Sequence, residues 1–219
     1  MKTTQQLMNS IRILVMLMTA IAANLVVASE ETDVAHLQQR WAEVNYQLEG
    51  RTQLSAFEQL VEQADQLSQQ FPASAPVWIW SGIIKSTYAG AKGGLGALGL
   101  AKDAKKDLDK AMKIDANAMG GSASTTLGTL YHSVPGWPVG FGDEEKAEEL
   151  LRRAVALSSE DIDANYFYGI YLLDEKRYEE AQNYLTRAQQ AAPRPNRPIA
   201  DTGRQQEISD ALATLRSKI

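Results

Sequence analysis

Apolar residues recur at intervals of three and four along most of this chain, the spacing of a helix with one buried face. No stretch sustains the period-two alternation that is typical of a half-buried strand. Two such helices open the folded part, with apolar positions at Val34, Leu37, Trp41, Val44 and Leu48 and at Leu54, Phe57, Leu60, Ala64 and Leu67. The pattern predicts an all-α protein of about nine helices.

A pattern of small residues in 162–195 predicts two helices that pack closely. Gly169 in a first helix is followed twelve residues later by Ala181 in a second one. Residues this small let two helix backbones approach, Leu185 fills the groove between them, and Pro193 ends the second helix. The spacing resembles the 34-residue tetratricopeptide repeat, a helix-turn-helix unit that stacks on its neighbours.

The same pattern recurs twice upstream. Leu151 lies 34 residues before Leu185, and the first helix of its unit carries Gly128. A third copy pairs Gly82 with Leu108. The sequence therefore predicts a helical-hairpin solenoid, with repeat-like units at about 76–117, 119–160 and 162–195.

The two upstream copies have longer connections between their helices. The excess over the last unit is seven residues in the second copy, where the loop VPGWPVGFG stands, and ten in the first, at the glycine-rich residues 89–102. Prolines and glycines keep a helix from running through the VPGWPVGFG segment. Because both excesses fall at corresponding turns, we expect them to form one composite lip.

Residues 29–219 are predicted to form a single domain that ends in a capping helix at about 202–218. The segment RPNRP before that helix predicts a stiff extended linker. The helix itself has one apolar stripe, which suits a terminal cap, at Ile208, Ala211, Leu212, Leu215 and Ile219.

Residues 1–28 have the pattern of a secretory signal peptide. Lys2 and Arg12 precede a long apolar run, and small residues at its end favour cleavage after Ala28. A retained N-terminal anchor is the alternative. Either reading predicts that the folded part is periplasmic, and cleavage would leave no stable membrane span.

Charge and cysteine content narrow the classes of partner. Without residues 1–28, the 22 basic residues fall to 20 against 27 acidic ones, a net charge of −7. The short basic clusters are interleaved with aspartates, so we expect no nucleic-acid partner. The chain has no cysteine, which excludes disulfides, thiolate metal sites and a lipid-acceptor cysteine.

Motifs that could carry chemistry are present but weak. Residues 94–99 fit the dinucleotide fingerprint GxGxxG, yet they follow a predicted helix at 76–88 and not a strand. The two histidines, His36 and His132, have no evident catalytic or metal-binding partner. The paired glutamates are accounted for by helix formation, because negative charge stabilises the start of a helix. We therefore predict no catalytic residue, no metal site, no cofactor and no enzymatic activity.

Aromatic residues are concentrated on the first helices and on the inserted loop. First helices of stacked tetratricopeptide units line the concave surface, so some of these rings should face a shared groove. About half of them should belong to the core. The residues that remain as ligand- or partner-binding candidates are Trp80, Tyr88, Tyr131, Trp137, Phe141 and Tyr171.

The string PGWPVGFGDEEKAEEL, residues 135–150, and the Asn165-Tyr166-Phe167-Tyr168-Gly169 helix resemble the T component of periplasmic TRAP transporters. The resemblance covers roughly residues 75–192. It implies a non-enzymatic periplasmic protein, a homotrimer, that encloses a hydrophobic cavity or pore and docks a TRAP-type solute-binding protein. The ligand would be a hydrophobic small molecule such as an organic acid or a lipid.

Two other hypotheses stand beside this one. The chain could be a generic envelope scaffold that grips a protein or peptide, as many tetratricopeptide proteins do. Such a clamp needs Asn, Lys or Arg in its groove, whereas the sequence predicts aromatic and small residues there. A hydrolase ranks last, because no nucleophile or metal set is assembled.

Overall fold

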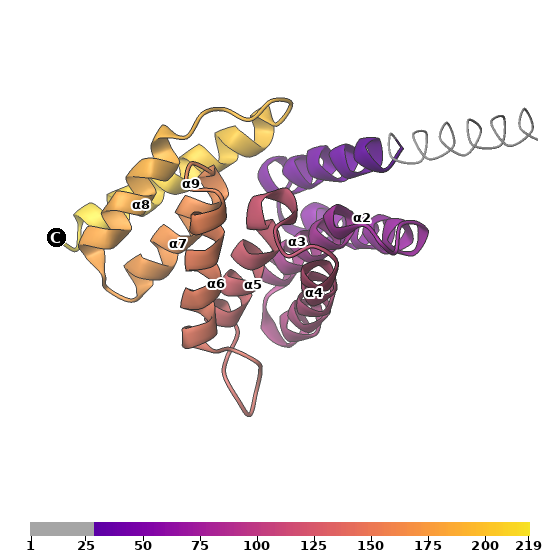
Figure 1. Ribbon diagram of the computed structural model, residues 1–219, viewed down its shortest axis with the longest axis horizontal. Helices are drawn as coiled ribbons and strands as arrows, with labels where there is room; N and C mark the ends of the chain where they lie inside the picture. Colours follow the sequence, from indigo (N-terminus) through magenta and orange to yellow (C-terminus); the bar gives the residue numbers. More distant parts are fainter. Residues whose placement is uncertain (1–28) are drawn as a thin grey trace, which may run out of the picture. The chain divides into compact units, whose positions relative to one another are not determined.

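The computed structural model describes residues 29–219, and this part of the chain contains helices and no strand. Residues 29–47 are helical, and eight further α-helices follow (Figure 1). They are α2 (Gly50–Gln70), α3 (Ala75–Lys92), α4 (Gly94–Ile114), α5 (Ser122–Ser133), α6 (Glu144–Leu157), α7 (Ile162–Asp174), α8 (Tyr178–Gln190) and α9 (Pro198–Arg216), with a short 3-10 helix, η1 (Ala118–Gly121), before α5. The prediction of an all-α fold with about nine helices is confirmed.

Residues 37–219 form one compact unit, which we call the second unit, and its boundary with the preceding part of the chain falls after His36. The predicted signal peptide, residues 1–28, lies outside the described residues. The second unit contains all three predicted repeats and α9. Between residues 29 and 219, none of the helices has both the length and the apolar composition that crossing a bilayer requires.

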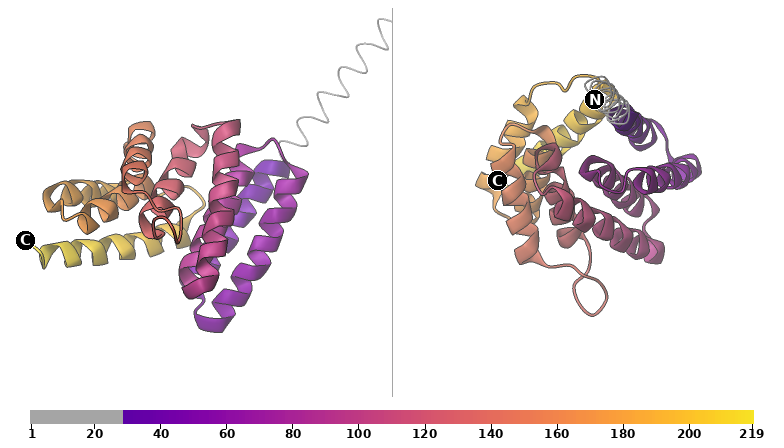
Figure 2. Two further views of the ribbon diagram at one scale, coloured as in Figure 1. Left: turned by 90° about the horizontal axis from the view of Figure 1, so that it is seen from below. Right: turned by 45° about the vertical axis from the view of Figure 1, so that its right-hand side comes forward.

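Three helical hairpins, α3–α4, α5–α6 and α7–α8, follow one another along the second unit (Figure 2). In each hairpin a glycine of the first helix faces a leucine of the second so closely that an added Cβ atom would overlap it. The pairs, with the distance from that Cβ to the leucine Cγ, are Gly82 and Leu108 (2.4 Å), Gly128 and Leu151 (2.7 Å), and Gly169 and Leu185 (2.8 Å). The repeat pattern of the sequence is therefore a repeated packing contact.

The glycine-rich residues 89–102 do not form a loop, and this part of the predicted lip is wrong. Both α3 and α4 continue through the segment, and Gly93, at φ +62°, makes the whole connection between them. Ala97 and Leu100 pack against the hydrophobic core of α3, α4 and α5. This burial favours a helix in spite of the glycines. The ten extra residues therefore lengthen α3 and α4 and form no loop between them.

The other excess is a loop, residues 134–143, which projects between α5 and α6 (Figure 2). Its two sides are joined by a hydrogen bond from the Gly142 amide to the Pro135 carbonyl, 3.0 Å long. At Gly140 the loop comes close to α4, since an added Cβ would lie 3.4 Å from Leu98 Cδ1. The two insertions therefore lie at the same edge of the second unit. One is the loop at residues 134–143, and the other lengthens α4, which this loop approaches.

The RPNRP segment forms a turn and not the extended linker that its prolines predict. The Arg197 amide donates to the Arg194 carbonyl at 3.3 Å, and Asn196 has φ +61°. Asp201, in the first turn of α9, accepts hydrogen bonds from both the backbone and the guanidinium of Arg194, each at 2.6 Å. An extended segment would lose these partners.

Helix α9 joins the two ends of the second unit. Its apolar stripe, with Ile208 and Leu215, packs on the core of α7 and α8. On another side Tyr46, from the helix that precedes α2, packs over Gly203, where an added Cβ would lie 2.2 Å from ring atom Cδ1. The Tyr46 hydroxyl also donates to Glu207 at 3.4 Å. The predicted cap thus has a second role, because it closes the fold against its own beginning.

Candidate functional site

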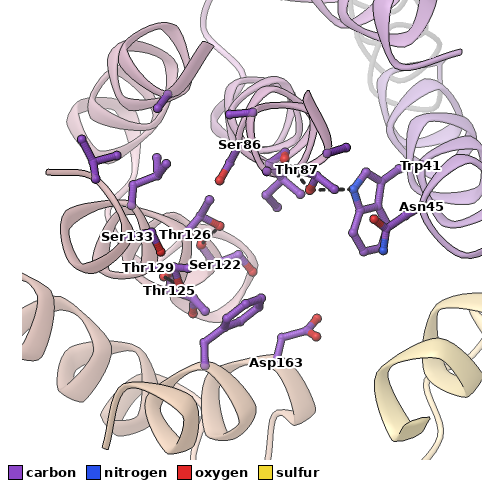
Figure 3. Close-up of a pocket in the computed structure, with 18 of the residues that line it drawn as sticks. Trp41, Asn45, Ser86, Thr87, Ser122, Thr125, Thr126, Thr129, Ser133 and Asp163 are labelled. Carbon is purple, nitrogen blue, oxygen red and sulfur yellow. Dashed lines mark hydrogen bonds between the residues drawn. The ribbon is translucent and has the colours of Figure 1, made fainter. Parts of the chain in front are cut away.

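A cavity of about 860 Å³ lies within the second unit, and we call it the inner cavity. The first helices of the three hairpins, α3, α5 and α7, contribute to its wall. Trp41, Asn45 and Gln53 on one side and residues of α9 on the other complete it, so both ends of the second unit take part. Figure 3 shows side chains that line it.

One face of α5 lines the inner cavity with hydroxyl groups. These stand at helical spacing and are Ser122, Thr125, Thr126, Thr129 and Ser133 (Figure 3). The Thr126 hydroxyl donates to the Ser122 carbonyl at 3.0 Å and the Thr129 hydroxyl to the Thr125 carbonyl at 2.9 Å. Because these protons are used within the helix, the two threonine oxygens are left to accept hydrogen bonds.

Aromatic and aliphatic side chains from other elements also line the inner cavity. Trp41 and Trp80 meet edge to face, with ring centroids 5.8 Å apart, and Ile83 and Leu98 extend the surface. The Trp41 Nε1–H donates to the Thr87 hydroxyl at 3.0 Å. A ligand that fills this space would contact both these apolar side chains and the hydroxyls of α5.

Charged residues gather where α7 meets α9. Arg204 is buried and pairs with Asp163 at 2.7 Å and with Glu207. Its guanidinium also lies over the rings of Tyr166 and Phe167, 4.4 and 4.5 Å from their centroids. A planar guanidinium that pairs with two carboxylates and stacks on aromatic rings makes contacts that suit arginine better than lysine.

Asp163 holds two arginines at this point. Its second oxygen pairs with Arg194. Burial acts to raise the pKa of Asp163, but the charges of Arg204 and Arg194 outweigh it and lower the pKa to about 2. The carboxylate is therefore ionised at neutral pH, and it binds α7 to α9 and to the turn before α9.

The polar part of the wall corrects the expectation that aromatic and small residues alone line the groove. Asn45, Gln53 and Arg197 also border the inner cavity. They come from the first helices and from the turn before α9, segments that the repeat pattern treats as peripheral. Only the closure of the fold brings them to the hairpins. The hydroxyl face of α5, in contrast, is visible in the sequence as Ser and Thr at helical spacing.

The six aromatic residues singled out by sequence lie in different places. Trp80 borders the inner cavity and is 3% exposed. Tyr88 is in the core, stacked on Phe57 with ring centroids 5.7 Å apart. Tyr171 is also buried, against the rings of His132 and Tyr168.

The remaining three belong to the inserted loop or its flank. Tyr131 and Phe141 meet edge to face with centroids 5.6 Å apart, and Lys105 lies over both rings. Trp137, in contrast, is 90% exposed, and Val139 beside it is 61% exposed. The structure thus does not join the six residues into one wall: Trp80 faces the inner cavity and Trp137 faces outward.

His132 has two acidic partners that the sequence did not reveal. Its Nδ1 lies 2.8 Å from Glu144 and its Nε2 lies 3.1 Å from Asp174. Burial acts to lower the pKa of His132, but the two carboxylates prevail and raise it. When the imidazole is protonated, both ring nitrogens donate to these carboxylates. Within residues 29–219, no group of His, Asp and Glu side chains is arranged to hold a metal ion.

A second buried polar cluster connects α2, α3 and α4. Lys85 pairs with Asp107 and with Asp65, and the Ser81 hydroxyl donates to the same Asp107 oxygen at 2.8 Å. Ser81 is fully buried, and Lys85 and Asp107 are nearly so. A substrate could not reach this serine, so the cluster connects three helices and is no nucleophile site.

Comparison with known proteins supports the same fold. Residues 139–199 match the tetratricopeptide repeat family. The crystal structure of a thermophilic tetratricopeptide-repeat protein of Thermus thermophilus is similar, with a TM-score of 0.55, 16% identity, and coverage of 84% of this chain and 99% of that one. No curated protein matches the chain in sequence. The prediction of a tetratricopeptide-like solenoid is confirmed.

Proposed function

We propose that this protein is a non-enzymatic binding scaffold that holds its ligand in the inner cavity. The cavity itself is the observation that supports this: about 860 Å³ is within the range of small-molecule sites. Its wall combines an apolar surface with polar groups that could orient a ligand, as small-molecule sites do. The burial of Ser81 gives further support to a role without catalysis.

The resemblance to TRAP T components makes the proposal more specific. On that reading the protein is periplasmic and trimeric, and the ligand is an organic acid or lipid-like solute that is exchanged with a TRAP-type solute-binding protein. Light scattering on the purified protein would measure the oligomeric state directly.

Occupancy of the inner cavity is tested with Nile red, an uncharged apolar dye that fluoresces when it leaves water. The wild-type protein should bind it at micromolar concentration. Thr126 borders the cavity and is half-buried, so Thr126→Trp should fill the space and abolish the signal. Thr214→Trp, on an exposed part of α9, makes the same change outside the cavity and should leave binding intact.

If the wild-type protein gave no Nile red signal, the inner cavity would not be an apolar binding site. Equal loss in the two tryptophan variants would also contradict the proposal, since it would point to a general change in the fold.

A second candidate function is protein binding, which tetratricopeptide-like scaffolds support in general. The specific observation is Trp137, 90% exposed at the tip of a loop, because isolated tryptophans are strong anchors in protein interfaces. The partner would be the solute-binding protein or another envelope protein. Asn45 and Arg197 also meet the requirement set above for a groove that grips a peptide.

Trp137→Ala should weaken co-elution with the cognate solute-binding protein and leave the helical circular-dichroism spectrum unchanged. Ile219→Ser, which removes an apolar side chain 72% exposed at the C-terminus, is the matched control and should bind as the wild type does. A loss of helicity in Trp137→Ala would instead mean that the loop is structural.

A further inference from the structure

Two hydrogen-bond donors at the wall of the inner cavity have no acceptor. Trp80 Nε1 and Arg197 Nε are both buried, and neither has a hydrogen-bond partner among the residues that the structure describes. The Arg197 guanidinium lies over the Trp80 ring, 5.2 Å from its centroid, and both residues border the inner cavity. The unpaired donors are therefore neighbours in one place.

Such groups are costly unless something binds to them. A buried donor without an acceptor loses its hydration and gains no hydrogen bond in return, and the cost is larger for a charged group. Burial, and after it the charge of Arg194, lower the pKa of Arg197. A guanidinium nevertheless stays protonated at neutral pH, and among the described residues no carboxylate forms a direct ion pair with Arg197, although Asp163, Asp201 and Asp161 lie near enough to act on its charge.

The neighbouring charges leave Arg197 without a carboxylate of its own. Arg194 forms ion pairs with Asp163 and Asp201, and Arg204 forms ion pairs with Asp163 and Glu207. The remaining acid, Asp161, caps α7 by accepting from the Ala164 amide at 2.8 Å. Each acidic group already has a donor, and the acceptor that Arg197 and Trp80 lack is not supplied by these side chains.

We propose that Arg197 and Trp80 form an anchor for a carboxylate group carried on an apolar body. The carboxylate accepts from the guanidinium and from the indole N–H, a charge-assisted pair that suits arginine geometry. The apolar body lies along Trp41, Ile83 and Leu98. Asp161, Asp163 and Glu207 border the same cavity and repel a doubly charged group, so a monoanion is favoured over a phosphate. This inference rests on the proposed binding function of the cavity.

The test compares dodecanoate with dodecanol as competitors for Nile red. The two share an apolar chain and differ in the charged group. Arg197→Gln should weaken dodecanoate binding about tenfold or more, the usual effect of losing a hydrogen bond to a charged group, and leave Nile red and dodecanol unchanged. Trp80→Phe keeps a ring, removes the N–H, and should weaken dodecanoate by a smaller factor.

Arg216→Gln is the matched control, because it makes the same change on an exposed part of α9. It should affect none of the three ligands. Thermal unfolding adds a readout that separates an anchor from a structural residue: Arg197→Gln should be at least as stable as the wild type, since it removes a half-buried charge that has no direct ion-pair partner.

The outcomes separate the two proposals. Absence of Nile red binding by the wild type would contradict the cavity function itself. Nile red binding with dodecanoate affinity unchanged in Arg197→Gln would overturn the anchor alone, as would a large loss of stability in that variant. An apolar peptide tested with a free and with an amidated C-terminus identifies the source: Arg197-dependent preference for the free form supports the anchor and assigns it to a chain end.

Discussion

At Gly169 the first helix of the last hairpin comes so close to the second that one methyl group would not fit. An added Cβ would lie 2.8 Å from Leu185 Cγ and 3.2 Å from the Leu185 backbone nitrogen. A side-chain tip could move aside, but a backbone atom cannot move without shifting α8. The hairpin therefore requires a small residue at position 169. This requirement explains why the small-residue pattern of the sequence predicts the repeat.

Gly169→Ala should therefore destabilise the protein by about 1–3 kcal/mol, the usual cost of overpacking, even though alanine is the better helix former. Urea unfolding followed by circular dichroism measures this as a lower midpoint. Gly99→Ala is the control, because Gly99 is an exposed helical residue of α4 with nothing within 4 Å of the added Cβ. It should gain up to about 1 kcal/mol from helix propensity.

A destabilised Gly99→Ala would contradict this account, since it would mean that the glycines of α4 are needed for something other than a helix. The same control bears on residues 94–99. Their fingerprint-like spacing has no strand before it, and in the structure they form the first turns of α4.

Among the elements, α5, α6 and α7 are connected by one histidine. His132 near the end of α5 reaches Glu144 at the start of α6 and Asp174 at the end of α7. This connects the second hairpin to the third through ion pairs that exist only while the imidazole is protonated. The junction between these hairpins should accordingly respond to pH.

The pKa of His132 is raised in the folded protein, because the two carboxylates outweigh the effect of burial. A raised pKa stabilises the fold fully below the unfolded value of about 6.5, and this contribution is lost as the pH rises through the folded value. The free energy of unfolding should therefore fall between about pH 6 and about pH 8.5, and it should fall less in His132→Gln.

Urea titrations at the two pH values measure this difference. His36→Gln is the matched control, because it replaces an exposed histidine and should keep the pH dependence of the wild type. Identical slopes in His132→Gln and in the wild type would show that the ion pairs contribute nothing to stability.

The elements also show how far the sequence could be read. Helical spacing and the small-residue pattern predict the three hairpins, because both follow from contacts within one hairpin. The glycines in residues 89–102 predict a connecting loop, but the burial of Ala97 and Leu100 outweighs the low helix propensity of these glycines. The prolines of RPNRP predict an extended linker, but the hydrogen bonds that Asp201 accepts from Arg194 stabilise a turn.

The candidate site was less readable, because it depends on contacts between distant segments. Trp80 was predicted and borders the inner cavity, whereas Tyr88 and Tyr171 pack into the core. Arg197 was missed, since nothing near it in sequence shows that α9 returns to α3. Periodicity describes one element at a time, and the wall of this cavity is assembled by the whole second unit.

At the scale of the second unit, the closure between its two ends is the contact on which the inner cavity depends. Tyr46 lies over Gly203 and bonds to Glu207, and this places α9, with Arg204, beside the helix that carries Trp41 and Asn45. If this contact is loosened, the hairpins should remain folded while the cavity loses one side of its wall. Stability and binding are then separable by one substitution.

Gly203→Val should act in this way, because its Cβ would lie 2.2 Å from the Tyr46 ring. Hydrogen exchange measured by mass spectrometry should become about tenfold faster in residues 37–47 and in α9, as expected when one cooperative segment opens more often, and stay unchanged in α5 and α6. Nile red affinity should fall with it. Gly99→Val, in open space on α4, should change neither. Uniformly faster exchange would show that the closure is inseparable from the rest of the fold, and unchanged exchange would show that the cavity does not depend on it.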